Sequence, residues 1–310
     1  MTENPQTVVL SLGAGVQSST LLLLAVEGVL PKPDLAVFAD TGWEPRVVYD
    51  HLARLTAVAA EAGIPVERVS SGNLRDDLLH AERRFASIPY YVRNPDGSQG
   101  MARRQCTSEY KVKPIKARVR ELLGYPHPQP VPRWVFAEQW VGFSTDEVHR
   151  VDGGKHTPRY LRSRYPLLEL GMSRRDCERW LRARGWAATK SACIGCPYHG
   201  NAVWRRLRDN SPAEWAEAVA FDEAIRAGGA RAHPLKGEAF LHRSCVPLGI
   251  APIDHVTSNE WRERQVDLRD LLAEDGDPDG CSPFGCRSGS PVNGSRPALE
   301  SSGERPGGTS

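Results

Sequence analysis

The sequence predicts an α/β fold built on a doubly wound, mostly parallel sheet. Short apolar, β-branched runs alternate with longer helical patterns between residues 7 and 69, and Gly-rich or Pro-rich turns separate them. Strands and helices that alternate at this spacing form βαβ units, which place helices on both faces of a parallel sheet. The chain has 310 residues, 40% of them hydrophobic and 25% charged, which is typical of a globular protein with one large or two domains.

The N-terminal elements follow from these patterns. The run TVVLSL is a strand of the buried type, and a turn of small residues separates it from a Leu-rich helical stretch. A second buried-type strand, DLAVFAD, precedes a long amphipathic stretch that Gly63 closes. The expected strands are residues 7–12, 34–40 and 65–69, and the expected helices are residues 17–27 and 46–62. Ligands of such sheets bind at the carboxyl ends of the strands.

The pattern becomes irregular after residue 89, and a mainly helical, cysteine-bearing C-terminal region follows. We expect a basic helix at 113–123, one long strand or a strand pair at 134–143, and helices at 173–184 and 212–226. Ser173 is an expected N-cap, and Ser211 with Glu214 forms an expected capping box. The predicted units are an α/β nucleotide-binding domain (1–160), a helical and loop region with the cysteine motifs (161–286) and a disordered tail rich in Ser, Gly and Pro (287–310).

Charge and hydropathy limit the partners of the chain. The net charge is only +2, but residues 103–120 contain seven cations and a single acid, which favours an anionic ligand such as a phosphate or a nucleic-acid backbone. Solvated helix faces explain the same charges equally well. The longest apolar run, residues 21–26, is far too short for a membrane span, and residues 1–6 do not look like a signal peptide. We therefore expect a cytoplasmic protein without a membrane partner.

The loop after the first strand carries the first functional pattern. Residues 11–20 place small side chains and hydroxyls between a strand and a helix N-terminus, where free backbone N–H groups bind anions. Ser18, Ser19 and Thr20 add hydroxyl donors. The segment is neither a Walker A loop nor a GxGxxG fingerprint. A turn that needs glycine only for packing is the alternative.

The pattern Ser-x-Gly-x-x-x-Gln-Ser-Ser in this loop resembles the PP-loop of the N-type ATP pyrophosphatases and of the phosphoadenosine phosphosulfate (PAPS) reductases. The second strand ends in Asp-Thr-Gly followed by Pro45, which is similar to the reductase branch. The resemblance implies an adenine-nucleotide α-hydrolase-like fold that binds ATP with Mg²⁺, with Asp40 near the metal or the ribose. The nucleotide-binding residues that it implies are Ser11, Gly13, Gly15, Gln17, Ser18, Ser19, Asp40, Thr41 and Gly42. Gln17 stands where the ATP pyrophosphatases usually carry Asp.

Seven cysteines without a secretion signal favour metal ligation or redox chemistry over disulfides. Cys106 precedes Lys111 in a C-x4-K-x2-P pattern, and Cys193 with Cys196 forms a CxxC. Both features are similar to the bacterial adenylylsulfate (APS) reductases and the iron–sulfur ATPases of DNA phosphorothioation, in which they hold a [4Fe–4S] cluster. The resemblance implies these three cysteines as ligands, and it implies that Lys111 compensates the negative charge of the cluster or nucleotide.

The fourth ligand of such a centre has two candidates, Cys281 and Cys286, of which we favour Cys286 because it precedes the tail. A zinc site made of the CxxC, His199 and one further ligand satisfies the same spacing, and a reduced CxxC without metal is the third possibility. Cys177 and Cys245 are expected to be buried structural thiols.

Two further groups of residues have competing interpretations. Arg150 follows two acidic residues in an expected helix opening, so it either contacts a phosphate or substrate carboxylate or belongs to a capped helix. Tyr198, Trp204, Arg205 and neighbouring residues interleave aromatic and cationic side chains, which either bind a base and a phosphate or form part of the core.

Three functions are consistent with these patterns. The first is an iron–sulfur PP-loop enzyme that adenylylates a substrate with ATP before a sulfur or related nucleophile attacks; a nucleic acid (tRNA or DNA) and a sulfur-donor protein are its candidate partners. The second is a thiol-dependent reductase of APS or PAPS that uses a C-terminal cysteine. The third is a nucleic-acid-binding module with a structural cluster and no turnover, which Gln17 in place of Asp favours.

Overall fold

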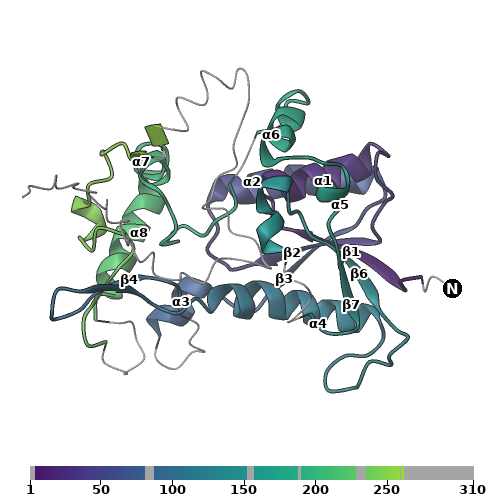
Figure 1. Cartoon of the computed structure of the whole chain (residues 1–310), viewed down its shortest axis with the longest axis horizontal. Coiled ribbons are helices and arrows are strands. Elements are labelled where there is room, and N and C mark those ends of the chain that lie inside the picture. The colour runs from purple at the N-terminus through teal and green to yellow at the C-terminus, as the bar shows by residue number, and fades with distance from the viewer. Residues whose placement is uncertain are drawn as a thin grey trace, which may run out of the picture.

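A five-stranded parallel sheet forms the centre of the computed structural model (Figure 1). Its order is β3-β2-β1-β6-β7, and every neighbouring pair is parallel. The strands are β1 (Thr7–Leu12), β2 (Leu35–Asp40), β3 (Val66–Ser70), β6 (Ala137–Trp140) and β7 (Leu161–Arg164). The structure describes residues 4–80, 87–151, 157–187, 190–227, 235–258 and 260–261. The α/β fold with a mostly parallel sheet is confirmed.

Helices cover both faces of this sheet (Figure 1). One face carries α1 (Val16–Val26), α2 (Arg46–Glu61) and α6 (Arg174–Arg182), and the opposite face carries α4 (Lys113–Leu122). The strand residues alternate between these two layers because successive side chains point to opposite faces. In β1, Leu10 packs toward α1 whereas Val9 packs toward α4.

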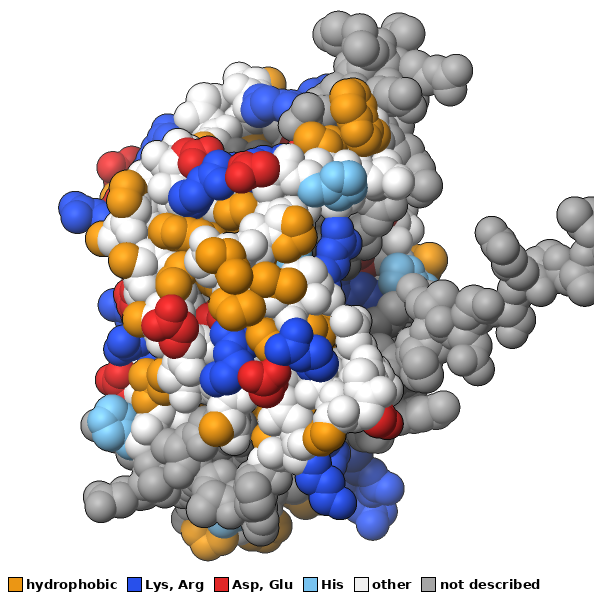
Figure 2. All heavy atoms as spheres, turned by 90° about the vertical axis from the view of Figure 1, so that its left-hand side faces the viewer, with side chains coloured by type: hydrophobic (Ala, Val, Ile, Leu, Met, Phe, Trp, Pro, Cys, Tyr) orange, Lys and Arg blue, Asp and Glu red, His pale blue; other side chains and the backbone are white. Residues whose placement is uncertain are grey.

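A second lobe lies beyond the carboxyl edge of the sheet (Figure 1). It contains an antiparallel sheet of order β5-β4-β8 and a separate apolar core around Trp204 and Phe221. Its elements are α3 (Leu74–Leu79), β4 (Tyr91–Arg93), β5 (Gln99–Met101), the π-helix η1 (Thr107–Val112), α7 (Asn201–Asn210), α8 (Pro212–Ala224), β8 (Glu238–Phe240) and the 3-10 helix η3 (Leu248–Ile250). Figure 2 shows the outer face of this lobe, where hydrophobic side chains gather among charged ones.

Two chain segments return from the second half of the sequence to the parallel sheet. β7 pairs with β6, and α6 packs on α1, so the sheet and its covering helices continue past residue 160. The short helices α5 (Pro166–Glu169) and η2 (Thr145–Arg150, 3-10) connect these elements. The predicted boundary at residue 160 therefore falls immediately before a strand of the same sheet.

Two local predictions are wrong. The strand expected over 134–143 is only β6, because the chain turns at Gly142 to approach the first turn of α1. The capping box of Ser211 is absent, since its side chain makes no cap hydrogen bond. Glu214 instead accepts a hydrogen bond from the backbone N–H of Arg46 at 2.7 Å and caps α2 from the other lobe. The Ser173 cap is confirmed, with Asp176 as its reciprocal partner.

Within the described ranges, no helix has the length and apolar character that a membrane span needs. The tail predicted for residues 287–310 lies outside the described residues, as do Cys281 and Cys286.

Candidate functional site

The loop between β1 and α1 is closed by its own serine. The Ser18 hydroxyl accepts a hydrogen bond from the Gly13 N–H at 3.0 Å and donates to the Gly15 carbonyl at 3.3 Å. Gly15 is the N-cap of α1 and supplies no side chain, so the first N–H groups of the helix have no side-chain cap. The loop thus combines glycine backbone with the positive end of a helix dipole, which is the arrangement that binds anions.

Ser19 has a different environment from the one predicted. Its side chain is fully buried, and its hydroxyl lies 2.9 Å from Nε2 of His51 on α2. Thr20 is also buried, and its hydroxyl donates to the Val16 carbonyl. Both hydroxyls therefore serve the α1–α2 interface, and their predicted role as phosphate donors is not supported by this geometry. The helical period accounts for the difference, because only Ser18 lies on the loop side of the first turn.

The end of β6 meets this loop at the point where the strand order reverses, which is the usual ligand crevice of open α/β sheets. A Cβ on Gly142 would lie 3.0 Å from the backbone nitrogen of Ser18, so only glycine permits this approach. Gln17 donates from Nε2 to Glu147 at 3.0 Å, and Ser11 accepts a hydrogen bond from Gln139 at 2.6 Å. No sequence pattern indicates the role of Gly142 beyond the glycine itself.

Asp40 ends β2 and is almost completely buried. One carboxylate oxygen accepts hydrogen bonds from the Gly42 N–H and the Tyr49 hydroxyl, each at 2.8 Å. The other oxygen lies 2.9 Å from Nε of Arg68. Burial, followed by the contact with Asp40, raises the pKa of Tyr49 well above its usual range, so this phenol remains a donor. Asp40 is therefore held in place from three directions at the carboxyl edge of the sheet.

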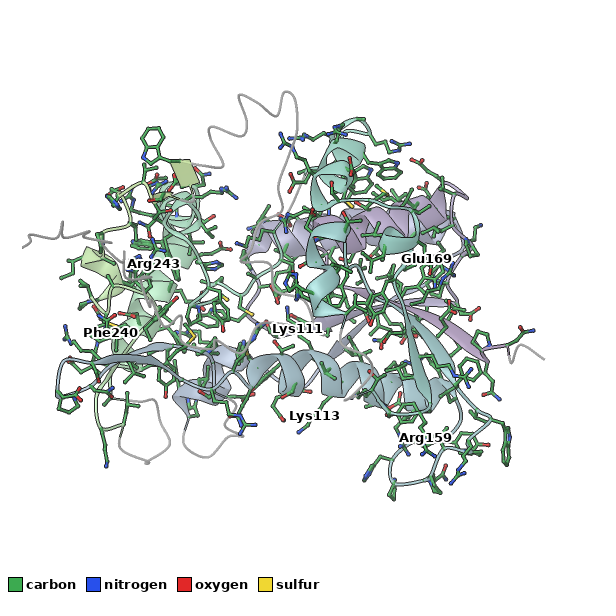
Figure 3. The ribbon with its side chains drawn as sticks, viewed as in Figure 1. Lys111, Lys113, Arg159, Glu169, Phe240 and Arg243 are labelled. Carbon is green, nitrogen blue, oxygen red and sulfur yellow. The ribbon has the colours of Figure 1, made fainter. Side chains whose placement is uncertain are left out.

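A buried ion pair lies next to Thr41. Nζ of Lys111, on η1, is 3.3 Å from Oε1 of Glu44, and the two side chains are 8% and 0% exposed. The same oxygen accepts a hydrogen bond from the Thr41 hydroxyl at 3.2 Å, whereas Oε2 has no hydrogen-bond partner among the described residues. Charges this deeply buried occur in pairs because an isolated one is costly to desolvate. Lys111 lies at the junction of the two lobes (Figure 3).

Cys106, Cys193 and Cys196 line one pocket beside this ion pair, together with Thr41 and Lys111. The Sγ atom of Cys193 is 3.3 Å from the Thr41 hydroxyl. Cys106 stands immediately before the π-helix, a form that occurs frequently at functional sites. The two cysteine motifs are far apart in sequence, and the fold brings them together at the carboxyl edge of the sheet.

The CxxC turn rests on Trp43, a residue to which no sequence motif assigned a role. The N–H of Ile194 donates to the Trp43 carbonyl at 2.9 Å, and a Cβ on Gly195 would lie only 2.0 Å from Cη2 of the indole ring. The ring is fixed by a hydrogen bond from Nε1 to Glu217 at 2.8 Å and by a tilted contact with Phe221. The loop after β2 therefore positions the cysteine turn directly.

The thiols of this pocket suit a cluster better than a single metal ion. Across the described ranges, no group of three or more His, Cys, Asp or Glu side chains is arranged to hold one metal ion. The ligands of a single zinc ion lie within about 2.3 Å of it, whereas the cysteines of an iron–sulfur cluster each bind a different iron and stand further apart. Three thiols around one shared pocket fit the second arrangement. His199, the zinc alternative, has Nε2 at 2.9 Å from the carbonyl of Cys193 and packs on Trp204.

The remaining predicted residues divide clearly. Cys177 and Cys245 are buried away from this pocket, and burial raises the pKa of the Cys177 thiol to about 12, as expected of structural thiols. Trp204 is fully buried in the second core, which supports the packing interpretation for this residue. Cys286, the favoured fourth ligand, remains a prediction because it lies outside the described residues.

Comparison with protein-family models finds no match for this sequence, and comparison with curated proteins finds none either.

Proposed function

We propose that this chain is an iron–sulfur PP-loop enzyme of the ATP pyrophosphatase type, which adenylylates a substrate for later sulfur transfer. One observation carries the proposal: cysteines from two distant motifs line one pocket, and Thr41, directly after Asp40, lines it too. The proposed nucleotide site and the proposed cluster site thus share one loop. The strand order and the glycine loop before α1 support an adenine-nucleotide α-hydrolase-like fold.

In the proposed reaction, a nucleophile of the substrate attacks the α-phosphorus of ATP. The bond between that phosphorus and the oxygen bridging to the β-phosphate breaks, and pyrophosphate leaves. Backbone N–H groups of the Gly13–Gly15 turn and the positive end of α1 bind the phosphates before the charge develops, which is the main contribution of protein to phosphoryl chemistry. Asp40 is held rigidly at the loop mouth, where Mg²⁺ accompanies the nucleotide.

Cys106, Cys193 and Cys196 would hold the cluster with Cys286 or Cys281 as the fourth ligand. When bound, a [4Fe–4S] cluster supplies electron transfer or a fixed charge at the site. The Lys111 cation, whose side chain is 8% exposed, lines the same pocket and offsets negative charge there.

Product analysis tests this function. The anaerobically purified chain is incubated with ATP and Mg²⁺ in the presence of tRNA, of DNA or of neither, and the products are separated. We expect AMP and pyrophosphate, or an adenylylated nucleic acid, and we expect Ser18→Ala to lower the yield. Arg46→Ala, at an exposed position of α2, is the control variant. Sulfite release from APS or PAPS with a thiol and no use of ATP would contradict the proposal and select the reductase.

A further inference from the structure

Arg150 is a buried arginine whose hydrogen bonds are incomplete. It ends η2, its side chain is only 10% exposed, and its Nη1 contacts Oε1 of Glu147. The guanidinium carbon lies 4.9 Å from the centre of the Phe143 ring. Nε and Nη2 of this side chain are buried, and neither has a hydrogen-bond partner in the described part of the chain. Leaving charged donors buried without acceptors is costly, so such groups call for an explanation.

The two open nitrogens form one edge of the guanidinium plane. Three other arginines of this protein use that same edge, Nε with Nη2, to bind both oxygens of one carboxylate. The pairs are Arg118 with Glu67 (2.6 and 2.9 Å), Arg184 with Glu27 (2.6 and 3.0 Å), and Arg164 with Glu169 (3.0 and 2.8 Å). This edge matches carboxylate and phosphate oxygens in a bidentate manner. In Arg150 the edge is buried and suits an oxyanion of the same kind.

The position of Arg150 indicates which oxyanion. Glu147, its partner through Nη1, is also the acceptor for Nε2 of Gln17 in the first turn of α1. One carboxylate thus separates the Arg150 guanidinium from the positive end of α1. Asp146, the other acid of this turn, accepts hydrogen bonds from the Arg174 N–H at 2.6 Å and from the Ser144 hydroxyl at 3.2 Å.

We propose that the Nε and Nη2 edge of Arg150 binds a phosphate group held at the β1–α1 loop. The inference rests on the proposed function for the identity of the ligand, a nucleoside triphosphate or its pyrophosphate product. Two independent features converge on the same charge: the uncapped N-terminus of an eleven-residue helix and a buried cation with an open bidentate edge. A dianionic phosphate satisfies both, whereas a neutral nucleoside satisfies neither.

Calorimetric titration of the purified chain with inorganic pyrophosphate, ATP and adenosine tests this inference. The variants are R150Q, R150K and the control R164Q, whose Nε and Nη2 edge belongs to Glu169. We expect R150Q to weaken pyrophosphate and ATP binding by about tenfold or more and adenosine binding by less than about twofold. R150K, which keeps the charge but loses the edge, falls between R150Q and the wild type, and R164Q binds as the wild type does.

Equal affinities of the wild type, R150Q and R150K for ATP and pyrophosphate would overturn the inference. Wild-type binding of pyrophosphate but not ATP, weakened in R150Q, would support Arg150 while the proposed nucleotide function fails. If the wild type binds neither phosphate ligand, both fail. Should R150Q not fold, the pyrophosphate affinity of R150K alone decides, and a wild-type value counts against the inference.

Discussion

Gly195→Ala is the sharpest perturbation of the proposed cysteine centre. The added Cβ would lie 2.0 Å from Cη2 of Trp43, whereas two carbons in contact prefer about 3.5 Å. The ring or the CxxC turn must therefore move by about 1.5 Å. The ring is held by its hydrogen bond to Glu217 and by Phe221, and the turn is held by the Ile194 N–H, so neither moves freely.

Overpacking of this kind costs about 1–3 kcal/mol of unfolding free energy, and the severity of this clash favours the upper end. Because the displaced turn carries Cys193 and Cys196, we also expect iron content to fall by more than half. Urea unfolding and iron analysis measure the two effects. Gly249→Ala is the matched control, since its Cβ would meet nothing closer than Val219 Cγ1 at 3.5 Å. If Gly195→Ala keeps the stability and iron content of the wild type, the turn does not depend on its contact with Trp43.

Three other predictions follow from the described contacts. Burial lowers the pKa of His51 and of His242 to about 4, and the unfolded value is about 6.5, so each favours the folded state above pH 6.5 and loses about 2 kcal/mol between pH 8 and pH 5; urea unfolding at both pH values should show His51→Asn with a shallower pH dependence, and an unchanged slope would count against this. Ser18→Ala should weaken ATP binding, whereas Ser19→Ala should lower the melting temperature and leave ATP affinity intact, because its hydroxyl bonds to His51; the opposite pattern would show that Ser19 serves the ligand. Lys111→Met should cost about 3–5 kcal/mol by leaving Glu44 charged and buried, and adding Glu44→Gln should restore part of that stability; no recovery in the double variant would argue against a coupled pair.

Local sequence patterns were sufficient for the parallel sheet but not for the second lobe. The first two strands are apolar along most of their length, so their burial on both faces could be predicted. β7 was missed because Arg162 and Arg164 interrupt its four residues, and the pairing with β6 supplies what its composition lacks. The antiparallel sheet was missed because strands of three residues carry no period that sequence can reveal.

The site shows the same division between local and tertiary information. Spacing and resemblance predicted that Cys106 would approach Cys193 and Cys196, and the three do line one pocket. The burial of Ser19 against His51 depends on how α1 packs on α2, which no motif encodes. The contact of Trp43 with Gly195 likewise joins two distant segments, so a sequence pattern confined to either one could not predict it.

Iron and acid-labile sulfide measurements on the anaerobically purified full chain decide whether the cysteine pocket holds a cluster. We expect about four iron and four sulfide per chain with a broad visible absorption band. Cys106→Ser and Cys193→Ser should each lose most of the iron, while Cys245→Ser, a buried thiol outside the pocket, should retain it. Stoichiometric zinc without iron, or equal iron in Cys106→Ser and Cys245→Ser, would show that these cysteines do not hold an iron–sulfur cluster.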